Sequence, residues 1–389
     1  MGLPNPNDNG AAAGMGSGTR RSELVFAISA DYERRTGGWV YDTRVIKELA
    51  ALGWHVRELV LPAGFPHPDE AARAQSAEAF ARLADGTLVV TDQLCLGVLP
   101  EVAQREAQRL RLVMIVHHPL MLEEYGAGAD DAEADNAFGR SEREALRHVR
   151  LAIVTSGTTA EFLRDNFEVD PSRIVIAPPG TDSRALSEGS RGSELALLSV
   201  GAVVPRKDHG VLIGALNSLR DEQWRLTIVG NITRAPDHVA AVRARIAAAG
   251  LQDKVHLAGE LDDVALEEVW RGADIYVASS RHEGFGMAIA EAISRGLPVV
   301  TTAAGAVSEW LNPSAAMIVP TGDTAALAAA LARVLRQPET RAALMRGARE
   351  QRLQLTRWHE TATRVDAALL HIVGNTSRVP PPPLSSDGG

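Results

Sequence analysis

Short apolar runs alternate with stretches of helical periodicity along most of the chain. Residues 24–29 (LVFAIS) are a nearly continuous apolar run, whereas residues 41–52 carry the three-to-four-residue apolar spacing of a helix and end before Gly53. Continuous apolar strands, rather than alternating ones, are typical of parallel sheets that helices cover on both faces. The pattern therefore predicts an α/β fold.

The alternation continues in two series that are separated by a break. In the first, strands are expected at 24–29, 56–61, 87–91, 112–116, 152–155 and 174–177, and helices at 41–52, 101–109 and 140–148. In the second, strands are expected at 195–200, 224–229, 255–257, 275–278, 299–302 and 317–319, and helices at 209–219, 236–249, 264–272, from 287, 324–336, 338–354 and 360–373. Between them, Pro178-Pro179-Gly180 and an aperiodic stretch rich in Ser and Gly predict a linker over about 180–194.

Composition narrows the class of protein without naming it. With 389 residues, 45% hydrophobic and 23% charged, the chain has the size and composition of a globular protein of two or three domains. A net charge of −9 argues against a general nucleic-acid binder but leaves a local basic patch against a membrane open. Since there is one cysteine, Cys95, no internal disulfide can form, and a reducing, cytoplasmic location is expected.

The ends of the chain differ from its middle. Residues 1–21 are rich in Gly, Ala, Asn and Pro and lack the apolar core of a secretory signal, and residues 377–389 are rich in Pro, Ser and Gly. We expect a disordered leader and a disordered tail. No run of about 18 apolar residues occurs, so no transmembrane segment is expected.

The most informative stretch is SSRHEGFGMAIAEAISRGLPVVTT, residues 279–302. Glu283 and Glu291 stand eight residues apart, and a helix is expected to begin at Met287, directly after Gly284-Phe285-Gly286. A helix N-terminus with glycines before it suits phosphate, because its N–H groups are unpaired and it carries partial positive charge. Carboxylates there suit hydroxyl groups, so a ligand with both, such as a sugar nucleotide, is favoured.

This stretch resembles the E-x7-E motif of the retaining glycosyltransferases of family 4, which have the GT-B fold. E-G-F-G-M, the second Glu and G-L-P-V-V fall in the same order, and the resemblance extends along most of residues 23–375. Its other motifs are Gly37-Gly38, His117-His118, Pro179-Gly180-Thr181-Asp182, Val200-Gly201 and Arg206-Lys207.

The resemblance implies two doubly wound, Rossmann-like domains that face a central cleft. The N-terminal domain, residues 22–180, would bind the acceptor and would be joined by the C-terminal helix at about 357–374. The C-terminal domain, residues 195–356, would bind the nucleotide sugar.

Two cations in the second series are candidates for the donor diphosphate. Arg206 and Lys207 follow the strand at 195–200, where adjacent cations can face a diphosphate, although surface charge on a solvated turn is the alternative. By the resemblance, an Arg often follows the strand glycine; here that residue is Ala202, and Arg206 is expected to take its place.

The two glutamates take different roles by the resemblance. Glu283 would contact hydroxyls of the donor sugar, and Glu291 would hold the ribose hydroxyls, because a carboxylate can accept two hydrogen bonds from a diol. For Glu291 the alternative is a charge that merely complements the helix dipole. The backbone N–H groups expected to meet the diphosphate and sugar are those of Gly284, Phe285, Gly286 and Met287.

The first series supplies the opposite side of the expected cleft. His117 and His118 end a strand. By the resemblance, one of them would lie near the donor sugar; the residues do not decide which, and a purely structural role is the alternative. No third metal ligand is evident beside them, so neither a metal nor another cofactor is expected. Gly37 and Gly38, in a loop after the first strand, and Asn231, after a later strand, are expected to border the donor.

The predicted function is a retaining, metal-independent glycosyltransferase. It would move a sugar from a nucleoside diphosphate sugar to a hydroxyl of a carbohydrate, lipid-linked or small-molecule acceptor. The alternatives are a GT-B epimerase acting on a nucleotide sugar and a sugar-nucleotide-binding protein without turnover. A dehydrogenase is disfavoured because G-x-G-x-x-G is missing after both first strands.

Overall fold

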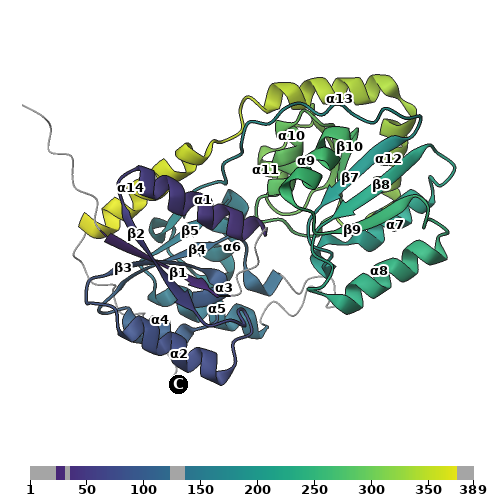
Figure 1. Cartoon of the computed structure of the whole chain (residues 1–389). Helices are drawn as coiled ribbons and strands as arrows, with labels where there is room; N and C mark the ends of the chain where they lie inside the picture. Colours follow the sequence, from purple (N-terminus) through teal and green to yellow (C-terminus); the bar gives the residue numbers. More distant parts are fainter. Residues whose placement is uncertain (1–22, 31–35, 123–135, 375–389) are drawn as a thin grey trace, which may run out of the picture.

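The computed structural model describes residues 23–30, 36–122 and 136–374. The predicted leader, 1–21, and the predicted tail, 377–389, lie outside these residues. The described chain forms two six-stranded sheets whose paired strands are parallel, and the two sheets with their helices lie side by side (Figure 1). The predicted α/β fold with two doubly wound sheets is confirmed.

The first lobe contains the sheet of order β2-β1-β3-β4-β5-β6. Its strands are β1 (Glu23–Ser29), β2 (His55–Leu61), β3 (Leu88–Asp92), β4 (Arg111–Val116), β5 (Leu151–Val154) and β6 (Ile174–Ile176). Its helices are α1 (Gly37–Ala51), α2 (Glu70–Ala81), α3 (Gln93–Leu96), α4 (Pro100–Glu106), α5 (Ala137–His148) and α6 (Gly157–Phe167).

The second lobe contains the sheet of order β12-β11-β10-β7-β8-β9. Its strands are β7 (Leu195–Val200), β8 (Trp224–Val229), β9 (Val255–Gly259), β10 (Ile275–Ala278), β11 (Val299–Thr302) and β12 (Ala316–Val319). Its helices are α7 (His209–Asn217), α8 (Pro236–Ala248), α9 (Asp263–Gly272), α10 (Met287–Ser294), α11 (Val307–Trp310), α12 (Thr324–Arg336) and α13 (Pro338–Gln351).

The last helix, α14 (Trp358–Gly374), returns to the first lobe, where it lies beside α1 (Figure 1). Val365 and Leu369 are fully buried in an apolar cluster with Leu24 and Val45. Its Asp366 accepts a hydrogen bond from the indole of Trp54 at 2.7 Å. Burial of these side chains, rather than helix propensity, holds α14 there.

The chain thus crosses between the lobes twice, and the two crossings touch. A Cβ built on Gly180, in the first crossing, would lie 2.3 Å from the backbone nitrogen of Trp358, in the second. The Thr181 N–H donates to the Thr356 carbonyl at 2.8 Å. Gly180 is therefore needed because two backbones meet at this point.

The observed elements follow the expected ones closely, with two kinds of difference. Gly37 and Gly38 were expected in a loop, but they are the first residues of α1, which Thr36 caps by accepting a hydrogen bond from the Trp39 N–H. Four helices were not expected, namely α2, α3, α6 and α11. Of these, α2 is dominated by alanine and shows no strong apolar stripe, whereas α6 begins with Gly-Thr-Thr, residues of low helix propensity.

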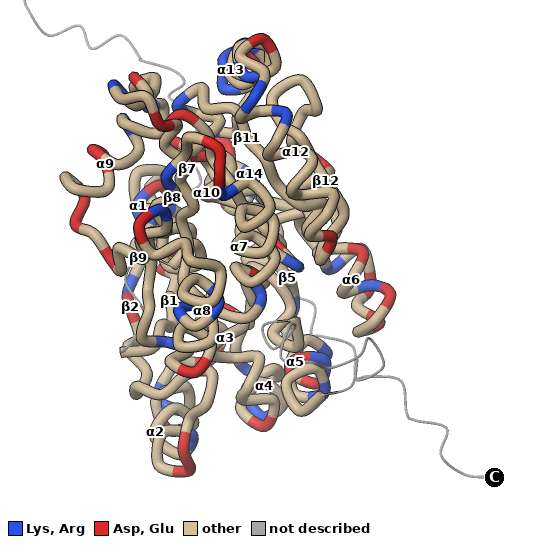
Figure 2. The backbone as a smooth tube through the Cα atoms, turned by 90° about the vertical axis from the view of Figure 1, so that its right-hand side faces the viewer, with Lys and Arg blue, Asp and Glu red and all other residues tan. Residues whose placement is uncertain are grey.

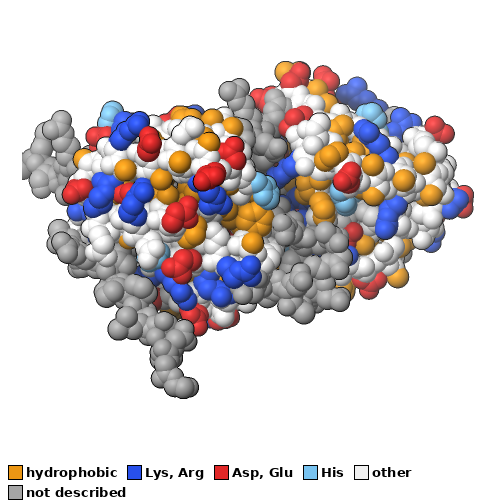
Figure 3. Space-filling model, turned by 90° about the horizontal axis from the view of Figure 1, so that it is seen from below, with side chains coloured by type: hydrophobic (Ala, Val, Ile, Leu, Met, Phe, Trp, Pro, Cys, Tyr) orange, Lys and Arg blue, Asp and Glu red, His pale blue; other side chains and the backbone are white. Residues whose placement is uncertain are grey.

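Charges of both signs are interspersed over the molecule, on the helices in Figure 2 and on the face of both lobes that Figure 3 shows. None of the helices in the described part of the chain is both long and apolar enough to span a bilayer.

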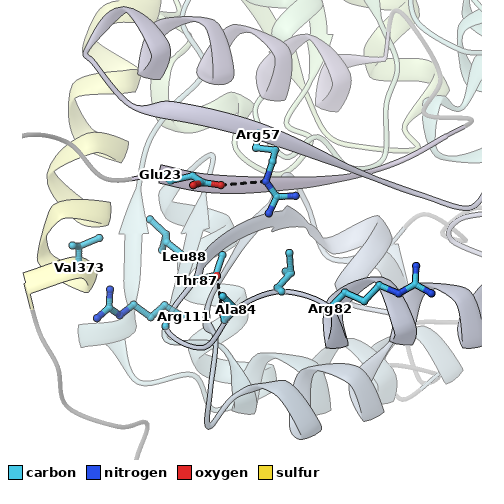
Figure 4. Close-up of a pocket in the computed structure, with 10 residues that line it drawn as sticks. Glu23, Arg57, Arg82, Ala84, Thr87, Leu88, Arg111 and Val373 are labelled. Atoms are coloured by element: carbon cyan, nitrogen blue, oxygen red, sulfur yellow. Dashed lines mark hydrogen bonds and ion pairs between the residues drawn. The ribbon is translucent and has the colours of Figure 1, made fainter.

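A pocket of about 330 Å³ lies where the strands of the first sheet begin (Figure 4). Glu23, Leu88 and Arg111, the first residues of three strands, line it, and Arg57 pairs with Glu23 at 3.2 Å. Ligands of open parallel sheets bind at the opposite, carboxyl ends of the strands. The motif residues lie at those carboxyl ends, so this pocket is not the candidate site.

Candidate active site

Glu283 lies in the loop between β10 and α10, where two cations surround its carboxylate. Its Oε1 accepts hydrogen bonds from Lys207 Nζ and from Ser280 Oγ, both at 2.6 Å, and Arg206 Nη1 lies 3.6 Å from its Oε2. The residue is only 8% exposed. Burial alone would raise the pKa of Glu283, but Lys207 and Arg206 outweigh burial and lower that pKa to about 2.

The two cations come from a short 3₁₀ turn, Pro205–Lys207, in the loop after β7. Arg206 also donates to the carbonyl of His282 at 2.9 Å, which ties this turn to the motif loop. Gly201, at φ 152°, lies under the Lys207 side chain: a Cβ there would be 3.1 Å from Lys207 Cε. The predicted Arg-Lys pair and the first motif glutamate are therefore one cluster.

The motif loop touches the first lobe through its backbone. A Cβ on Gly284 would lie 1.9 Å from the carbonyl oxygen of His117. The Thr155 hydroxyl, at the end of β5, lies 2.8 Å from that oxygen and 3.2 Å from the Gly284 carbonyl oxygen. The missing side chain of Gly284 therefore makes room for the facing lobe.

Phe285 in the loop and Met287 at the start of α10 are fixed by aromatic and apolar contacts. The Phe285 ring stacks on Trp310 with centroids 5.1 Å apart, and the Trp310 indole donates to the Phe285 carbonyl at 2.8 Å. Met287 packs against an apolar cluster of the first lobe, and its sulfur would lie 3.4 Å from a Cβ on Gly37. Gly286, at φ 90°, lets the chain turn into α10. Gly38 follows Gly37 in the first turn of α1.

Glu291 lies one turn into α10, in surroundings unlike those of Glu283. Its side chain is 31% exposed and lies 3.3 Å from Arg295 Nη2. Burial raises the pKa of Glu291; Arg295 and Arg184 lower it only in part, and the net pKa lies above its usual value. The structure thus separates the two motif glutamates: only Glu283 lies with the Arg-Lys pair.

Asn231 follows β8 as predicted, but its side chain takes part in a turn. Its Oδ1 accepts hydrogen bonds from the N–H groups of Thr233 and Arg234, at 2.9 and 2.8 Å. Its carbonyl accepts from the Val203 N–H at 2.9 Å, which fixes the loop after β7 next to it. Asn231 is therefore held by its own turn and by the loop that carries Arg206 and Lys207.

His117, at the end of β4, lies in a buried cluster with two aspartates that the sequence analysis did not single out. Its Nε2 is 3.2 Å from Asp42 Oδ1, and ligand-type atoms of Asp42, Asp92 and His117 all lie within 4.8 Å of one another. The Tyr41 ring packs edge-on at 5.2 Å. Burial lowers the pKa of His117, but Asp42 and Asp92 outweigh burial and raise it.

The sequence showed no further possible metal ligand beside the histidines, but in the folded structure Asp42 and Asp92 lie near His117. That expectation was therefore wrong. Asp42 comes from α1 and Asp92 from the end of β3, and only folding unites them with His117. All three are engaged within the protein: Asp42 pairs with His117, and Asp92 Oδ1 caps α3 by accepting the Cys95 N–H at 2.9 Å.

His118 takes a different direction from His117. Its ring lies 6.2 Å from the ring of His282, which precedes Glu283 in the second lobe. Its Cβ would lie 3.0 Å from a Cβ on Gly284. Both histidines therefore meet the motif loop, His117 through its backbone and His118 through its side chain.

Three further residues around the site were missed by the sequence analysis. Thr155 bridges the lobes, and Arg295 contacts Glu291. Glu309, in α11, caps α6 of the other lobe: its carboxylate accepts from the Gly157 N–H at 3.0 Å and from the Thr158 N–H. Of the missed residues, Asp92 carried a readable signal, an acid directly after a buried strand.

The site joins a buried carboxylate, two cations and a helix N-terminus at the carboxyl end of one sheet to a strand-end histidine pair of another. Such a two-lobed arrangement is typical of the GT-B class of glycosyltransferases. Comparison with known families agrees: residues 55–184 match "Glycosyltransferase Family 4" and residues 184–351 match "Glycosyl transferases group 1". The chain belongs to the family 4 type of GT-B glycosyltransferases, which confirms the resemblance.

Curated relatives are similar at modest identity. An MMP alpha-(1->4)-mannosyltransferase of Mycolicibacterium hassiacum is 28% identical over 328 residues, which cover 78% of this chain and 75% of the relative. A D-inositol 3-phosphate glycosyltransferase of Saccharomonospora viridis is 29% identical over 57% of this chain, and the match spans 55% of that relative's length.

Solved structures show the same fold at lower identity. A sucrose-phosphate synthase of Thermosynechococcus elongatus superposes with a TM-score of 0.76 at 21% identity, over 91% of this chain and all of that one. Anabaena Alr3699/HepE in complex with UDP and glucose superposes with a TM-score of 0.72 at 16% identity, over 89% of this chain and 99% of that one. At such identity they establish the fold.

Proposed function

We propose that this glycosyltransferase is retaining and metal-independent, and moves a sugar from a nucleoside diphosphate sugar to an acceptor hydroxyl. The observation that carries the proposal is the buried contact of Glu283 with Lys207 and Arg206 at the interface of the lobes. Cations held there can stabilise the charge that develops on a departing diphosphate, the task for which other enzymes use a metal.

The surroundings of Glu283 argue for orientation rather than proton transfer. A carboxylate with a pKa of about 2 is a weak base near neutral pH. With its Oε1 already bound by Lys207 and Ser280, it is suited to hold sugar hydroxyls in place. The acceptor would then attack from the face of the leaving group, and a phosphate oxygen would take its proton, which retains the configuration of the sugar.

Metal independence rests on the charges already present. Arg206, Lys207 and the N-terminus of α10 supply positive charge where the diphosphate would lie. The Asp42–Asp92–His117 group has the composition of a cation site, but its own ion pair and helix cap already use all three of its members. We therefore assign it to holding His117 and not to binding a metal.

The acceptor class and the location are further parts of the proposal. The relatives' names make a small hydroxylated molecule such as inositol 3-phosphate the first acceptor to try. A lipid-linked acceptor, with peripheral contact to a membrane, is the second. The buried, free Cys95, the one cysteine of the chain, supports work in the reducing cytoplasm.

The experiment supplies UDP-, GDP- and ADP-sugars with an acceptor panel and measures release of nucleoside diphosphate. We expect transfer from one donor, an unchanged rate in excess chelator, and an α-linked product from an α-linked donor by NMR. Loss of activity with chelator and recovery with magnesium or manganese would contradict metal independence. Release of an epimer or of free sugar alone would favour the epimerase or a hydrolase.

A further inference from the structure

Arg295 is a buried cation for which the proposed reaction so far has no use. It stands directly after α10 and four residues after Glu291, so the two side chains share one face of the helix. Its side chain is 2% exposed, whereas that of Glu291 is 31% exposed. Arg295 therefore lies behind Glu291 as seen from the solvent.

One nitrogen of the guanidinium makes both of its ionic contacts. Nη2 donates to Glu267 Oε2 at 2.5 Å and to Glu291 Oε1 at 3.3 Å. Glu267 comes from α9, so Arg295 links the motif helix to its neighbour. A bridging arginine of this kind restricts the rotamer of each carboxylate that it holds.

The guanidinium of Arg295 packs against the ring of Trp270. Its central carbon lies 5.1 Å from the centroid of the Trp270 ring, and Trp270 stacks on Tyr276 with centroids 5.5 Å apart. Both rings are buried in the apolar cluster under α10. Arg295 thus rests on a rigid surface, and its position is set by the core.

The remaining nitrogens show that stability alone does not explain this arginine. Nε and Nη1 of Arg295 are buried, and neither makes a hydrogen bond to the described residues. Burial also lowers the pKa of the guanidinium, against the raising effect of Glu291 and Glu267. A buried charge with unsatisfied donors is a poor stabiliser, and an apolar side chain often serves the fold better.

We propose that Arg295 is a positioning residue for the donor site, orienting the Glu291 carboxylate toward the ribose hydroxyls without touching the donor. The inference rests on the proposed function, since it gives Glu291 the ribose. Arg295, supported by the Trp270 ring, would then determine how strongly the site prefers a ribonucleotide over a nucleotide that lacks the ribose hydroxyls.

The test compares a nucleoside diphosphate with its 2′,3′-dideoxy analogue, using whichever of UDP, GDP or ADP binds the wild type best. Calorimetry gives the ratio of the two dissociation constants. We expect wild type to prefer the ribonucleotide by roughly tenfold to a hundredfold, as for hydrogen bonds to a charged group. In Arg295→Met this preference should fall close to that of Glu291→Ala, while affinity for the dideoxy analogue stays within about twofold to threefold.

Two variants separate positioning from mere structure. Arg271→Met removes an exposed arginine of α9 and should keep the wild-type preference. Glu267→Gln leaves the Arg295–Glu291 contact and should also keep it. If Glu267→Gln loses the preference as Arg295→Met does, the bridge to α9 is what matters and the inference fails.

The other outcomes are distinct. Equal loss of affinity for both nucleotides in Arg295→Met would mean that Arg295 contacts the diphosphate or that the site has collapsed, and either overturns the inference. Arg295→Lys, which keeps the charge and shortens the reach, should recover part of the preference. If the wild type binds neither nucleotide, the proposed function fails first; if it binds both equally, only the ribose role fails.

Discussion

Glu283 and Glu291 belong to one motif, eight residues apart, yet the fold gives them opposite electrostatic surroundings. Two cations and a serine hydroxyl hold Glu283, and its pKa falls to about 2. Glu291 shares one arginine with Glu267, and its pKa rises. Identical residues in a motif thus have different chemistry, because the charges around them come from other parts of the chain.

The largest expected effect separates the two roles. Glu283→Gln should lower kcat about a hundredfold or more, because it removes a preorganised charge at the reacting sugar, while the KM for the donor changes only a few-fold. Glu291→Gln should do the reverse, raising KM about tenfold with kcat nearly unchanged. Steady-state kinetics with the active donor measures both; equal losses of kcat and of affinity in Glu283→Gln would contradict its role.

A second variant tests whether the site depends on the close contact of the lobes. In Gly284→Ala the new methyl group would meet the His117 carbonyl oxygen, so the motif loop must move away. Since small displacements of reacting groups are costly, kcat/KM should fall at least about tenfold. Gly272→Ala, at a glycine with open space around it, is the matched control and should remain at the wild-type rate.

The contributions of Glu283 and Glu291 to the free energy of unfolding should depend on pH in opposite directions. Because the folded-state pKa of Glu283 lies below the ordinary value of 4.5, its contribution is present above about pH 4.5 and is lost as pH falls toward 2. It amounts to about 3 kcal/mol by linkage. The pKa of Glu291 is raised, so its ionised form adds no such stability at neutral pH.

Urea unfolding of Glu283→Gln and Glu291→Gln, each against wild type, measures this difference. We expect Glu283→Gln to be the less stable variant at pH 7 by about 3 kcal/mol, with the gap closing between pH 4.5 and pH 2. Glu291→Gln should show no comparable loss at pH 7. A constant gap for Glu283→Gln down to pH 2 would show that its ion pairs are not what stabilises it.

The smallest expected effect concerns the outer contact between the lobes. Glu309→Gln removes the charge with which α11 caps α6, worth about 1 kcal/mol. Small-angle scattering of the free protein should then show a slightly larger radius of gyration. Glu360→Gln, the control, alters a similar cap at the start of α14 and should leave the radius of gyration unchanged. If both variants have the same radius of gyration, Glu309 does not help to hold the two lobes together.

The fold could be predicted from the sequence because its signals are local. Buried parallel strands such as β4 and β11 are continuous apolar runs, and Gly296 and Pro298 mark the end of α10. Helix α2, which has no clear apolar stripe, was missed because this local signal is weak there. The start of α1 was placed four residues late because two glycines were taken as loop, although Thr36 is an effective N-cap.

The site was only partly predictable, because its decisive contacts are non-local. The Arg-Lys pair and Glu283 could be proposed from their places after strands, but the contact of Lys207 with Glu283 is formed across 76 residues of chain. Asp42 and Asp92 carry no motif, and the fold alone brings them to His117. No sequence pattern indicates that a carbonyl of the other lobe would fill the space beside Gly284.

The paired crossings at Gly180 and Trp358 have a consequence for the integrity of the enzyme. Because the polypeptide leaves the first lobe and later comes back to it, a single cleavage within residues 185–193 would give two fragments, and the second would carry α14 together with the second lobe. The packing of α14 on the first lobe would then hold the two fragments together without a covalent link. Such a nicked enzyme should migrate as two fragments under denaturing conditions yet elute as one species in native buffer. The same geometry makes the exposed stretch around Arg191 a natural place for new chain ends in a circularly permuted form.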